Sequence, residues 1–192
     1  EVPLIVPEVN PEAILKHKGI IANPNCSTII MLMALKPIYD LARIKRIIVS
    51  TYQAVSGAGK EGIDELTNQV GEYLDGKEMT ANILPSASAE KHYPIAFNLI
   101  PQIDVFCDNM YTKEEMKMVN ETRKILDDYD MRITATTIRV PVYRSHSESV
   151  NIELEKDVSL EEIKKALAAF PGVIVQDDPA AQLYPMPLYT SD

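Results

Sequence analysis

Cys26 is the side chain best placed to carry covalent chemistry in this sequence. It follows Asn25 and stands where an apolar segment, residues 27–41, predicts a helix. The unpaired N–H groups and the dipole at a helix N-terminus favour thiolate over thiol, and the thiolate is the nucleophilic form. The same N–H groups, with the Asn25 amide beside them, can hold a developing oxyanion. The alternative is a buried structural cysteine, and the residues alone leave both readings open.

A histidine and an arginine in the second half of the chain can serve the same chemistry. His146 lies in a polar segment, residues 144–149, between two strand-like segments, where it can act as a general base or be an exposed loop histidine. Arg139 interrupts a β-branched segment. It either binds a partner such as a ligand carboxylate or faces water at a sheet edge. Their odd separation places them on opposite faces of a regular strand, so bringing them together requires a bulge or bend at Pro141.

A glycine motif between these candidates resembles a dinucleotide-binding turn. Residues 57–62 read Gly-Ala-Gly-Lys-Glu-Gly, with a strand-like segment before them and a helical one after. The segment that follows, however, contains no second apolar strand ending in an acidic residue about 20 positions on, as a ribose-binding βαβ unit requires. We therefore reject a Rossmann turn here and expect only that the glycines let the backbone approach a ligand closely.

Alternating helical and strand-like patterns must position these side chains. Helices are expected at residues 27–41, 60–74, 112–127 and 160–169, and strands at residues 19–22, 45–55, 132–143, 148–155 and 173–176. The first helix is apolar on every side, which predicts burial all round. Thr112 with Glu115, and Ser159 with Glu162, have the spacing of capping boxes. We predict an α+β fold, with a mixed, largely antiparallel sheet and helices packed on one face.

The bulk composition restricts the class of protein. The chain has 192 residues, 46% of them hydrophobic and 24% charged, as expected for one globular domain with its own core. A net charge of −9 without a basic run argues against nucleic-acid binding. The apolar stretch at residues 29–35 is too short to span a membrane. Two distant cysteines predict neither a disulfide framework nor a zinc site, so we assign no metal and expect a reducing cytoplasm.

Several motifs, taken in order, resemble one enzyme family. They are Asn-Pro-Asn-Cys-Ser-Thr at 23–28, Ser-Thr-Tyr-Gln-Ala-Val-Ser-Gly-Ala-Gly at 50–59, His-Tyr-Pro-Ile-Ala-Phe-Asn at 92–98, Pro-Gln-Ile-Asp at 101–104, Arg-Val-Pro-Val at 139–142 and His-Ser-Glu-Ser at 146–149. Each motif is modest alone, but their order and spacing are specific. The sequence resembles the aspartate-semialdehyde dehydrogenases over nearly its whole length.

This resemblance implies a fold, a reaction and site roles. The fold is that of the C-terminal domain of glyceraldehyde-3-phosphate dehydrogenase, with residues 1–192 as one catalytic and dimerisation domain. The reaction converts L-4-aspartyl phosphate and NADPH to L-aspartate 4-semialdehyde and phosphate, on the route to lysine, threonine and methionine. The implied site roles are a nucleophile (Cys26), an acid/base (His146), an orienting amide (Gln53), substrate contacts (Arg139, Glu114, Lys117 and Asn25) and contacts to the nicotinamide end of NADP (Ser56 and Gly57).

The sequence also departs from that family. Its members carry a Rossmann domain before the cysteine and return to it through a C-terminal helix, whereas 25 residues precede Cys26 here. The chain also does not begin with Met, so we expect a piece of a larger enzyme that binds NADP negligibly and does not turn over alone. A homodimer with a small-molecule substrate is expected, without nucleic acid or membrane. The alternatives are an N-acetyl-γ-glutamyl-phosphate reductase domain and a non-catalytic dimerisation module in which Cys26 is buried.

Overall fold

The computed structural model describes residues 2–189 and divides into two compact units, each built from separate stretches of the chain. Unit 1 comprises Glu1–Val49, Lys117–Ala135 and Val150–Tyr184, and unit 2 comprises Ser50–Met116, Thr136–Ser149 and Pro185–Asp192. The assignment of the whole chain to one catalytic and dimerisation domain stays a prediction.

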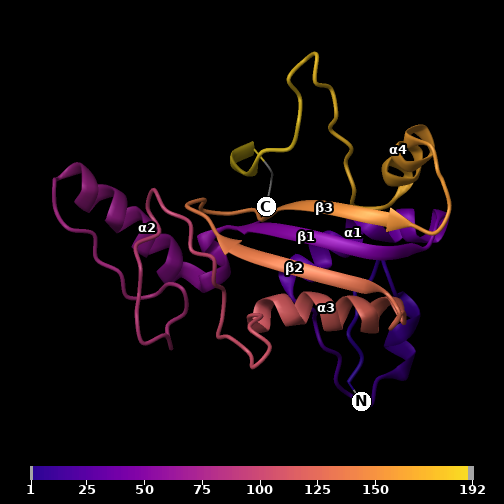
Figure 1. The fold of residues 1–192 in the computed structure, drawn as a ribbon, viewed down its shortest axis with the longest axis horizontal. Coiled ribbons are helices and arrows are strands. Elements are labelled where there is room, and N and C mark those ends of the chain that lie inside the picture. The colour runs from indigo at the N-terminus through magenta and orange to yellow at the C-terminus, as the bar shows by residue number, and fades with distance from the viewer. Residues whose placement is uncertain (1, 190–192) are drawn as a thin grey trace. The chain divides into compact units, whose positions relative to one another are not determined.

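Within residues 2–189, a three-stranded sheet and four α-helices make up the regular structure, and Figure 1 shows their arrangement. The strands are β1 (Ile44–Gln53), β2 (Arg132–Arg139) and β3 (Ser147–Leu154), in the order β2-β1-β3. Figure 1 shows β2 and β3 pointing in opposite directions on either side of β1, so the sheet is mixed and the predicted α+β class is confirmed. The helices are α1 (Cys26–Leu41), α2 (Gly59–Leu74), α3 (Lys113–Leu126) and α4 (Leu160–Ala169), with short 3₁₀ turns η1 (Pro11–Lys16), η2 (Val55–Ala58) and η3 (Pro187–Tyr189).

The core of unit 1 forms where α1 and α3 pack on the same part of the sheet. Met31 of α1 and Met118 of α3 are buried against Ile47 and Val49 of β1. Each such side chain contributes roughly 1.5–3 kcal/mol through the apolar surface it removes from water. The helices thus cover one face of the sheet here, as the apolar periodicity predicted.

The prediction that the first helix is buried on every side is wrong. Cys26, Ile30 and Ala34 are exposed at intervals of four residues, which places them on one stripe of α1. The opposite side carries the buried Met31 and Leu35. Hydrophobic composition alone cannot tell which side of a helix its neighbours cover, and no described element covers this stripe.

Other predicted elements differ from those observed. Residues 173–176 form no strand, because the chain turns at Gly172 (φ 79°) and leaves Ile174 84% exposed without a neighbouring strand. The predicted strand at 19–22 is reduced to a single bridge between Leu4 and Ala22. The strand predicted to reach residue 143 ends at Arg139, since Pro141 has no N–H to donate and the chain bends there.

Both predicted capping boxes are confirmed. Thr112 N–H donates to Glu115 Oε2 at 2.8 Å, and Glu115 N–H donates to Thr112 Oγ1 at 3.2 Å. Ser159 and Glu162 make the same reciprocal pair at the start of α4. These bonds satisfy N–H groups that a helix leaves unpaired at its first turn, so a local sequence signal was enough to locate both ends.

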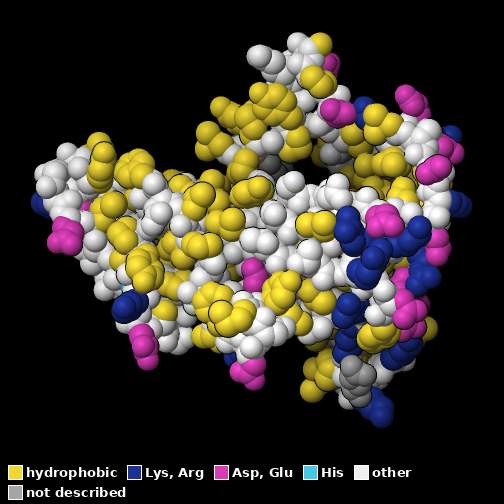
Figure 2. Space-filling view, viewed as in Figure 1, with side chains coloured by type: hydrophobic (Ala, Val, Ile, Leu, Met, Phe, Trp, Pro, Cys, Tyr) yellow, Lys and Arg dark blue, Asp and Glu magenta, His cyan; other side chains and the backbone are white. Residues whose placement is uncertain are grey.

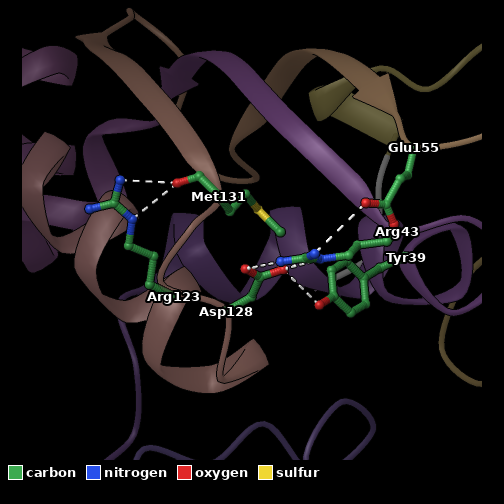
Figure 3. A network of polar contacts seen from close by, with 6 residues as sticks. All are labelled: Tyr39, Arg43, Arg123, Asp128, Met131 and Glu155. Atoms are coloured by element: carbon green, nitrogen blue, oxygen red, sulfur yellow. Dashed lines mark hydrogen bonds and ion pairs between the residues drawn. The ribbon is translucent and has the colours of Figure 1, made fainter.

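A polar network ties the ends of three elements of unit 1 together (Figure 3). Arg43, which follows α1, donates from Nε and Nη2 to the two carboxylate oxygens of Asp128 at 2.9 and 2.8 Å. Tyr39 Oη donates to Asp128 Oδ2 at 2.8 Å, and Glu155 lies 3.8 Å from Arg43 Nη1. The bidentate guanidinium holds the pKa of Asp128 below its ordinary value, despite the opposing effect of burial.

The core of unit 2 joins α2 to an irregular segment. Leu66 of α2 packs with Val55, Leu84 and Ile95. The side chain of Gln69, also on α2, is completely buried, and its Oε1 accepts the backbone N–H groups of Ile95 and Ala96 at 2.8 and 3.0 Å. These bonds fix a segment that lacks regular secondary structure. In the part of the chain that the structure describes, no helix is both long and apolar enough to cross a bilayer.

Candidate active site

Cys26 is the first residue of α1 in unit 1, and its side chain is exposed. The preceding Asn25 caps the helix, because its Oδ1 accepts the N–H of Thr28 at 3.2 Å. Asn25 is itself held in place by its backbone N–H, which donates to Glu121 Oε2 of α3 at 2.8 Å. A thiol at a capped and anchored helix N-terminus is suited to nucleophilic chemistry, and its exposure argues against the alternative of a buried structural cysteine. The sequence interpretation did not single out Glu121.

In unit 2 a single residue, Ala54, holds two of the predicted site residues. Its backbone N–H donates to His146 Nδ1 at 2.9 Å, and its carbonyl oxygen accepts from Arg139 Nη1 at 2.7 Å. Ala54 follows β1 directly, and the bond from Val140 N–H to Gln53 O joins that point to the end of β2. An alanine carries no chemical signal in a sequence, so its role is visible only in the structure.

The side chains of His146 and Arg139 also lie against the turn at Gly57. A Cβ atom at this position would lie 2.6 Å from Arg139 Nη1 and 3.3 Å from His146 Cε1. Glycine therefore permits the close approach of both side chains to the backbone, as expected from the glycine motif. The chain bends after Arg139, where Ser56 N–H donates to Tyr143 O at 3.1 Å, and this bend overcomes the odd spacing of Arg139 and His146.

The surroundings of His146 determine its protonation state. Burial is the largest cause that lowers its pKa from the ordinary 6.5, and the Arg139 guanidinium lowers it further, while the Glu114 carboxylate opposes both. The ring is therefore neutral at pH 7. Because Nδ1 accepts the Ala54 N–H, the neutral ring carries its proton on Nε2. His146 is thus set to donate a hydrogen bond, or a proton, from Nε2.

Gln53, Glu114 and Arg139 are polar side chains almost completely removed from water, with 1%, 5% and 4% exposed. Gln53 Nε2 donates to Glu114 Oε1 at 3.2 Å and to Thr51 Oγ1 at 3.3 Å. Glu114 lies in the first turn of α3, where the helix dipole favours a negative charge. Unit 2 therefore buries a carboxylate and a guanidinium, which are the groups that recognise an ammonium and a carboxylate respectively. The alternative of a water-facing Arg139 is wrong.

The remaining predicted residues are placed as follows. Unit 2 brings together Gln53, Gly57, Glu114, Arg139 and His146, and Ser56 lies on η2 beside Gly57. Cys26, Asn25 and Lys117 belong to unit 1. Lys117 is exposed on α3, one helical turn after the buried Glu114.

Glu148 is a partly buried residue with a buried carboxyl group, and the sequence interpretation missed it. It lies on β3, two residues after His146, and both of its carboxyl oxygens are buried without a hydrogen-bond partner among the described residues. Burial raises its pKa from the ordinary 4.5 to about 8, so the carboxyl is protonated at neutral pH. Its sequence neighbours are serines and valine, which give no signal that this glutamate is buried.

Comparisons with known proteins agree on one family. Residues 35–192 match the family described as "Semialdehyde dehydrogenase, dimerisation domain". Among curated relatives, the aspartate-semialdehyde dehydrogenase of Aquifex aeolicus is 56% identical over 190 residues, covering 98% of this chain and 54% of the relative. That of Bacillus subtilis is 54% identical over 186 residues, covering 96% and 54%. The chain therefore spans about half the length of the curated relatives it matches.

Solved structures give the same result. The crystal structure of aspartate semialdehyde dehydrogenase II complexed with ASA from Vibrio cholerae has a TM-score of 0.84 and 51% sequence identity, covering 89% of this chain and 49% of that one. Aspartate semialdehyde dehydrogenase with NADP from Candida albicans has a TM-score of 0.60 and 26% identity, covering 88% and 45%. The resemblance inferred from the motifs is thereby confirmed.

Proposed function

The chain belongs to the semialdehyde dehydrogenase dimerisation-domain family, and from that premise we propose that it is the catalytic and dimerisation domain of an aspartate-semialdehyde dehydrogenase. The reaction is the reductive dephosphorylation of L-4-aspartyl phosphate to L-aspartate 4-semialdehyde, in the biosynthesis of lysine, threonine and methionine. The observation that carries this proposal is the exposed Cys26 thiol at the start of α1, with Asn25 capping the helix.

Acyl transfer to Cys26 is the first step. The thiolate attacks the acyl carbon of L-4-aspartyl phosphate, a C–S bond forms, the C–O bond to the phosphoryl group breaks, and inorganic phosphate leaves. The aspartyl group is then held on Cys26 as a thioester. The backbone N–H groups at the helix N-terminus, with the Asn25 amide, stabilise the oxyanion that develops during the attack.

His146 controls the proton in the second step. When bound, NADPH supplies the hydride that reduces the thioester. The Nε2–H of neutral His146 donates its proton to the oxyanion of the resulting thiohemiacetal. His146 takes the proton back as the C–S bond breaks, which releases the semialdehyde and regenerates the Cys26 thiolate.

Buried charges recognise the substrate. We assign the Arg139 guanidinium to the substrate α-carboxylate, the Glu114 carboxylate to the α-amino group and the Gln53 amide to orientation of the acyl group. Their burial strengthens these interactions because little water competes for the charges. The exposed Lys117 on α3 is assigned to the phosphate group.

The backbone near Gly57 fits a contact with the nicotinamide end of NADP. Gly57 has no side chain, so the turn that it forms with Ser56 presents bare backbone next to His146 and Arg139. Ser56 and Gly57 are therefore the residues of this chain that we assign to the cofactor.

We also assign a homodimer to the chain, since the matching family is described as a dimerisation domain. The two free cysteines favour a cytoplasmic location.

Acyl transfer tests the proposal on the chain as it stands, because this half-reaction needs no hydride. Incubation with L-4-aspartyl phosphate, followed by peptide mass spectrometry, should reveal an aspartyl adduct on Cys26 and none on Cys107. N-acetyl-γ-glutamyl phosphate serves as the control substrate and should acylate Cys26 far more slowly. Adduct formation that is equal at both cysteines, or absent from Cys26, would contradict the proposed enzyme function.

A further inference from the structure

A hydrogen bond from α3 reaches the residue that precedes the nucleophile of the proposed reaction. The backbone N–H of Asn25 donates to Oε2 of Glu121 at 2.8 Å, although the two residues lie 96 positions apart in the chain. Both belong to unit 1, as does Cys26. The bond therefore depends on the packing of unit 1, and the residues around Cys26 do not encode it.

This bond restrains a segment that lies outside regular secondary structure. Residues 23–25 connect the isolated bridge at Ala22 to the first turn of α1. The first turn of a helix frays readily, because its N–H groups have no partner within the helix. The side chain of Asn25 satisfies one of these groups, the N–H of Thr28. Glu121 in turn holds the backbone of the capping residue itself.

The buried hydroxyl groups nearby do not share this role. Ser27 and Thr28 in the first turn of α1, and Thr122 next to Glu121 on α3, are completely buried. Their hydroxyl oxygens have no hydrogen-bond partner within the part of the chain that the structure describes. They contribute packing but no polar link, so the bond between Asn25 and Glu121 is a specific polar restraint at this end of α1.

The charges along α3 favour a carboxylate at position 121. Lys117 precedes Glu121 by four residues and Lys124 follows it by three, so the three side chains lie on one face of the helix. Lys124 Nζ also donates to the carbonyl oxygen of Val2 at 3.0 Å. Figure 2 shows lysine and arginine side chains mixed with acidic ones over the part of unit 1 where α3 ends. A carboxylate held among cations is a stronger acceptor than a neutral oxygen.

A second polar link, at the far end of α1, has a different position relative to the thiol. Tyr39 and Arg43 bond there to Asp128, which follows α3. That link is separated from Cys26 by most of the length of α1, whereas the Glu121 link ends on the residue bonded directly to Cys26. Both links stabilise unit 1, but only the second can control the position of the thiol.

We propose that Glu121 is a positioning residue for Cys26, which acts by fixing the backbone of the Asn25 cap. This inference rests on the proposed acyl transfer to Cys26. Glu121 needs no contact with the substrate in this role, because it orients the thiol and the neighbouring helix N–H groups through the chain. A displacement of about 1 Å can slow a reaction roughly 100-fold. The lost anchor should therefore lower the rate of acylation and leave substrate affinity unchanged.

The test compares Glu121→Met with Glu121→Gln in single-turnover acylation by L-4-aspartyl phosphate. Methionine has a similar length but no oxygen to accept the Asn25 N–H, so we expect the maximal rate to fall roughly 10- to 100-fold. The half-saturating concentration should not change. Glutamine keeps an oxygen at the same place and should restore most of the rate. Both variants remove the charge, so any effect through Lys117 appears equally in the two.

Thr122→Val is the matched control. It alters the next residue on α3, keeps the side-chain volume and removes a hydroxyl that has no partner among residues 2–189, so acylation should be unchanged. Alkylation of Cys26 by iodoacetamide, with Cys107 as the internal reference, repeats the comparison without the substrate. Glu121→Met should slow this reaction at Cys26 and leave it unchanged at Cys107. Thermal unfolding verifies that each variant is folded.

Four results separate the possible explanations. Acylation of Glu121→Met at the wild-type rate would overturn the inference. Equal slowing by Glu121→Gln would show that the charge matters and the anchor does not, and equal slowing by Thr122→Val would reduce the effect to packing. A wild-type chain that is not acylated at Cys26 would refute the proposed function. In that case alkylation still decides the role of Glu121, because equal rates for wild type and Glu121→Met would overturn it.

Discussion

Asp128 in unit 1 and Glu148 in unit 2 are both carboxyl groups with little access to water, yet their surroundings differ. Asp128 accepts two hydrogen bonds from Arg43 and one from Tyr39, and its pKa is lowered. Glu148 has no hydrogen-bond partner among the described residues, and burial raises its pKa to about 8. The first carboxylate is neutralised by side chains of its own fold, whereas the second acid remains uncompensated within the described chain.

The same contrast extends to the groups around each acid. In the polar network of unit 1 a guanidinium, a phenol and two carboxylates bond to one another, which stabilises the fold (Figure 3). In unit 2 His146 and Arg139 are both held by backbone atoms of Ala54. The hydrogen bond from the Ala54 N–H to Nδ1 orients the His146 ring and leaves its proton on Nε2. Buried polar groups thus stabilise unit 1, whereas in unit 2 they orient side chains to which we assign chemistry.

Glu148→Gln removes the uncompensated acid from this comparison, and we expect it to change the free energy of unfolding more than any other substitution. The folded chain keeps a proton on Glu148 up to about pH 8, while the unfolded chain releases it near 4.5, so wild-type stability falls as the pH rises between these values. Glutamine has no such proton. We expect the variant to gain about 4 kcal/mol relative to the wild type between pH 5 and pH 9, measured by urea unfolding. Parallel profiles would contradict the raised pKa, and the exposed Glu153→Gln serves as the control.

Gly57→Ala tests whether close approach positions the site. A methyl group there would collide with Arg139 Nη1 and press on the His146 ring, so the Arg139 guanidinium must shift from its place beside Ala54. We expect acylation of Cys26 by aspartyl phosphate to slow roughly 30-fold, equivalent to about 2 kcal/mol, with little change in the free energy of unfolding.

Gly71→Ala provides the matched control for that prediction. Gly71 lies inside α2, and a Cβ atom there meets nothing within 4 Å. This variant should gain about 0.5–1 kcal/mol of stability without slowing acylation. Equal acylation rates for the two alanine variants would show that Gly57 does not position the site.

Asp128→Asn should lower the stability of unit 1, which contains the polar network, without affecting acylation of Cys26. The amide loses the charge-assisted bonds to Arg43, and we expect stability to fall by about 1–2 kcal/mol at pH 7. Because the folded pKa of Asp128 is lowered, its stabilisation is present above the unfolded value and lost as the pH falls through the folded value. The deficit of the variant should therefore shrink in acid, as thermal unfolding from pH 7 to pH 3 would reveal. A constant deficit would exclude an ionic origin.

Ser159→Ala removes an exposed hydrogen bond between two residues that are close in sequence. Of the substitutions that remove a polar contact, it should have the smallest effect on stability. It removes the oxygen that accepts the Glu162 N–H at the start of α4, and we expect a loss of about 1 kcal/mol. Ser159→Asp retains an acceptor at this position and should recover most of that stability in denaturant titrations. A loss as large as that of Asp128→Asn would remove the distinction between the two kinds of contact.

Local patterns in the sequence predicted much of this fold. The four helices, both capping boxes and the position of Cys26 at a helix N-terminus depend on residues within a few positions of one another. Apolar periodicity and capping act over that range, so they can be read without knowing the fold. The strand predicted at 173–176 failed because a strand also needs a neighbour to accept its hydrogen bonds, and no local pattern supplies one.

The sequence by itself determined the helices, their caps, the α+β class and the residue types to which we assign the chemistry. Only the tertiary structure decided how those residues are held. His146 reaches Ala54 across 92 positions of the chain, and Arg139 reaches it across 85. Contacts of this range arise from packing of the whole chain, which sets hydrogen-bond partners and pKa values that no neighbouring residue encodes.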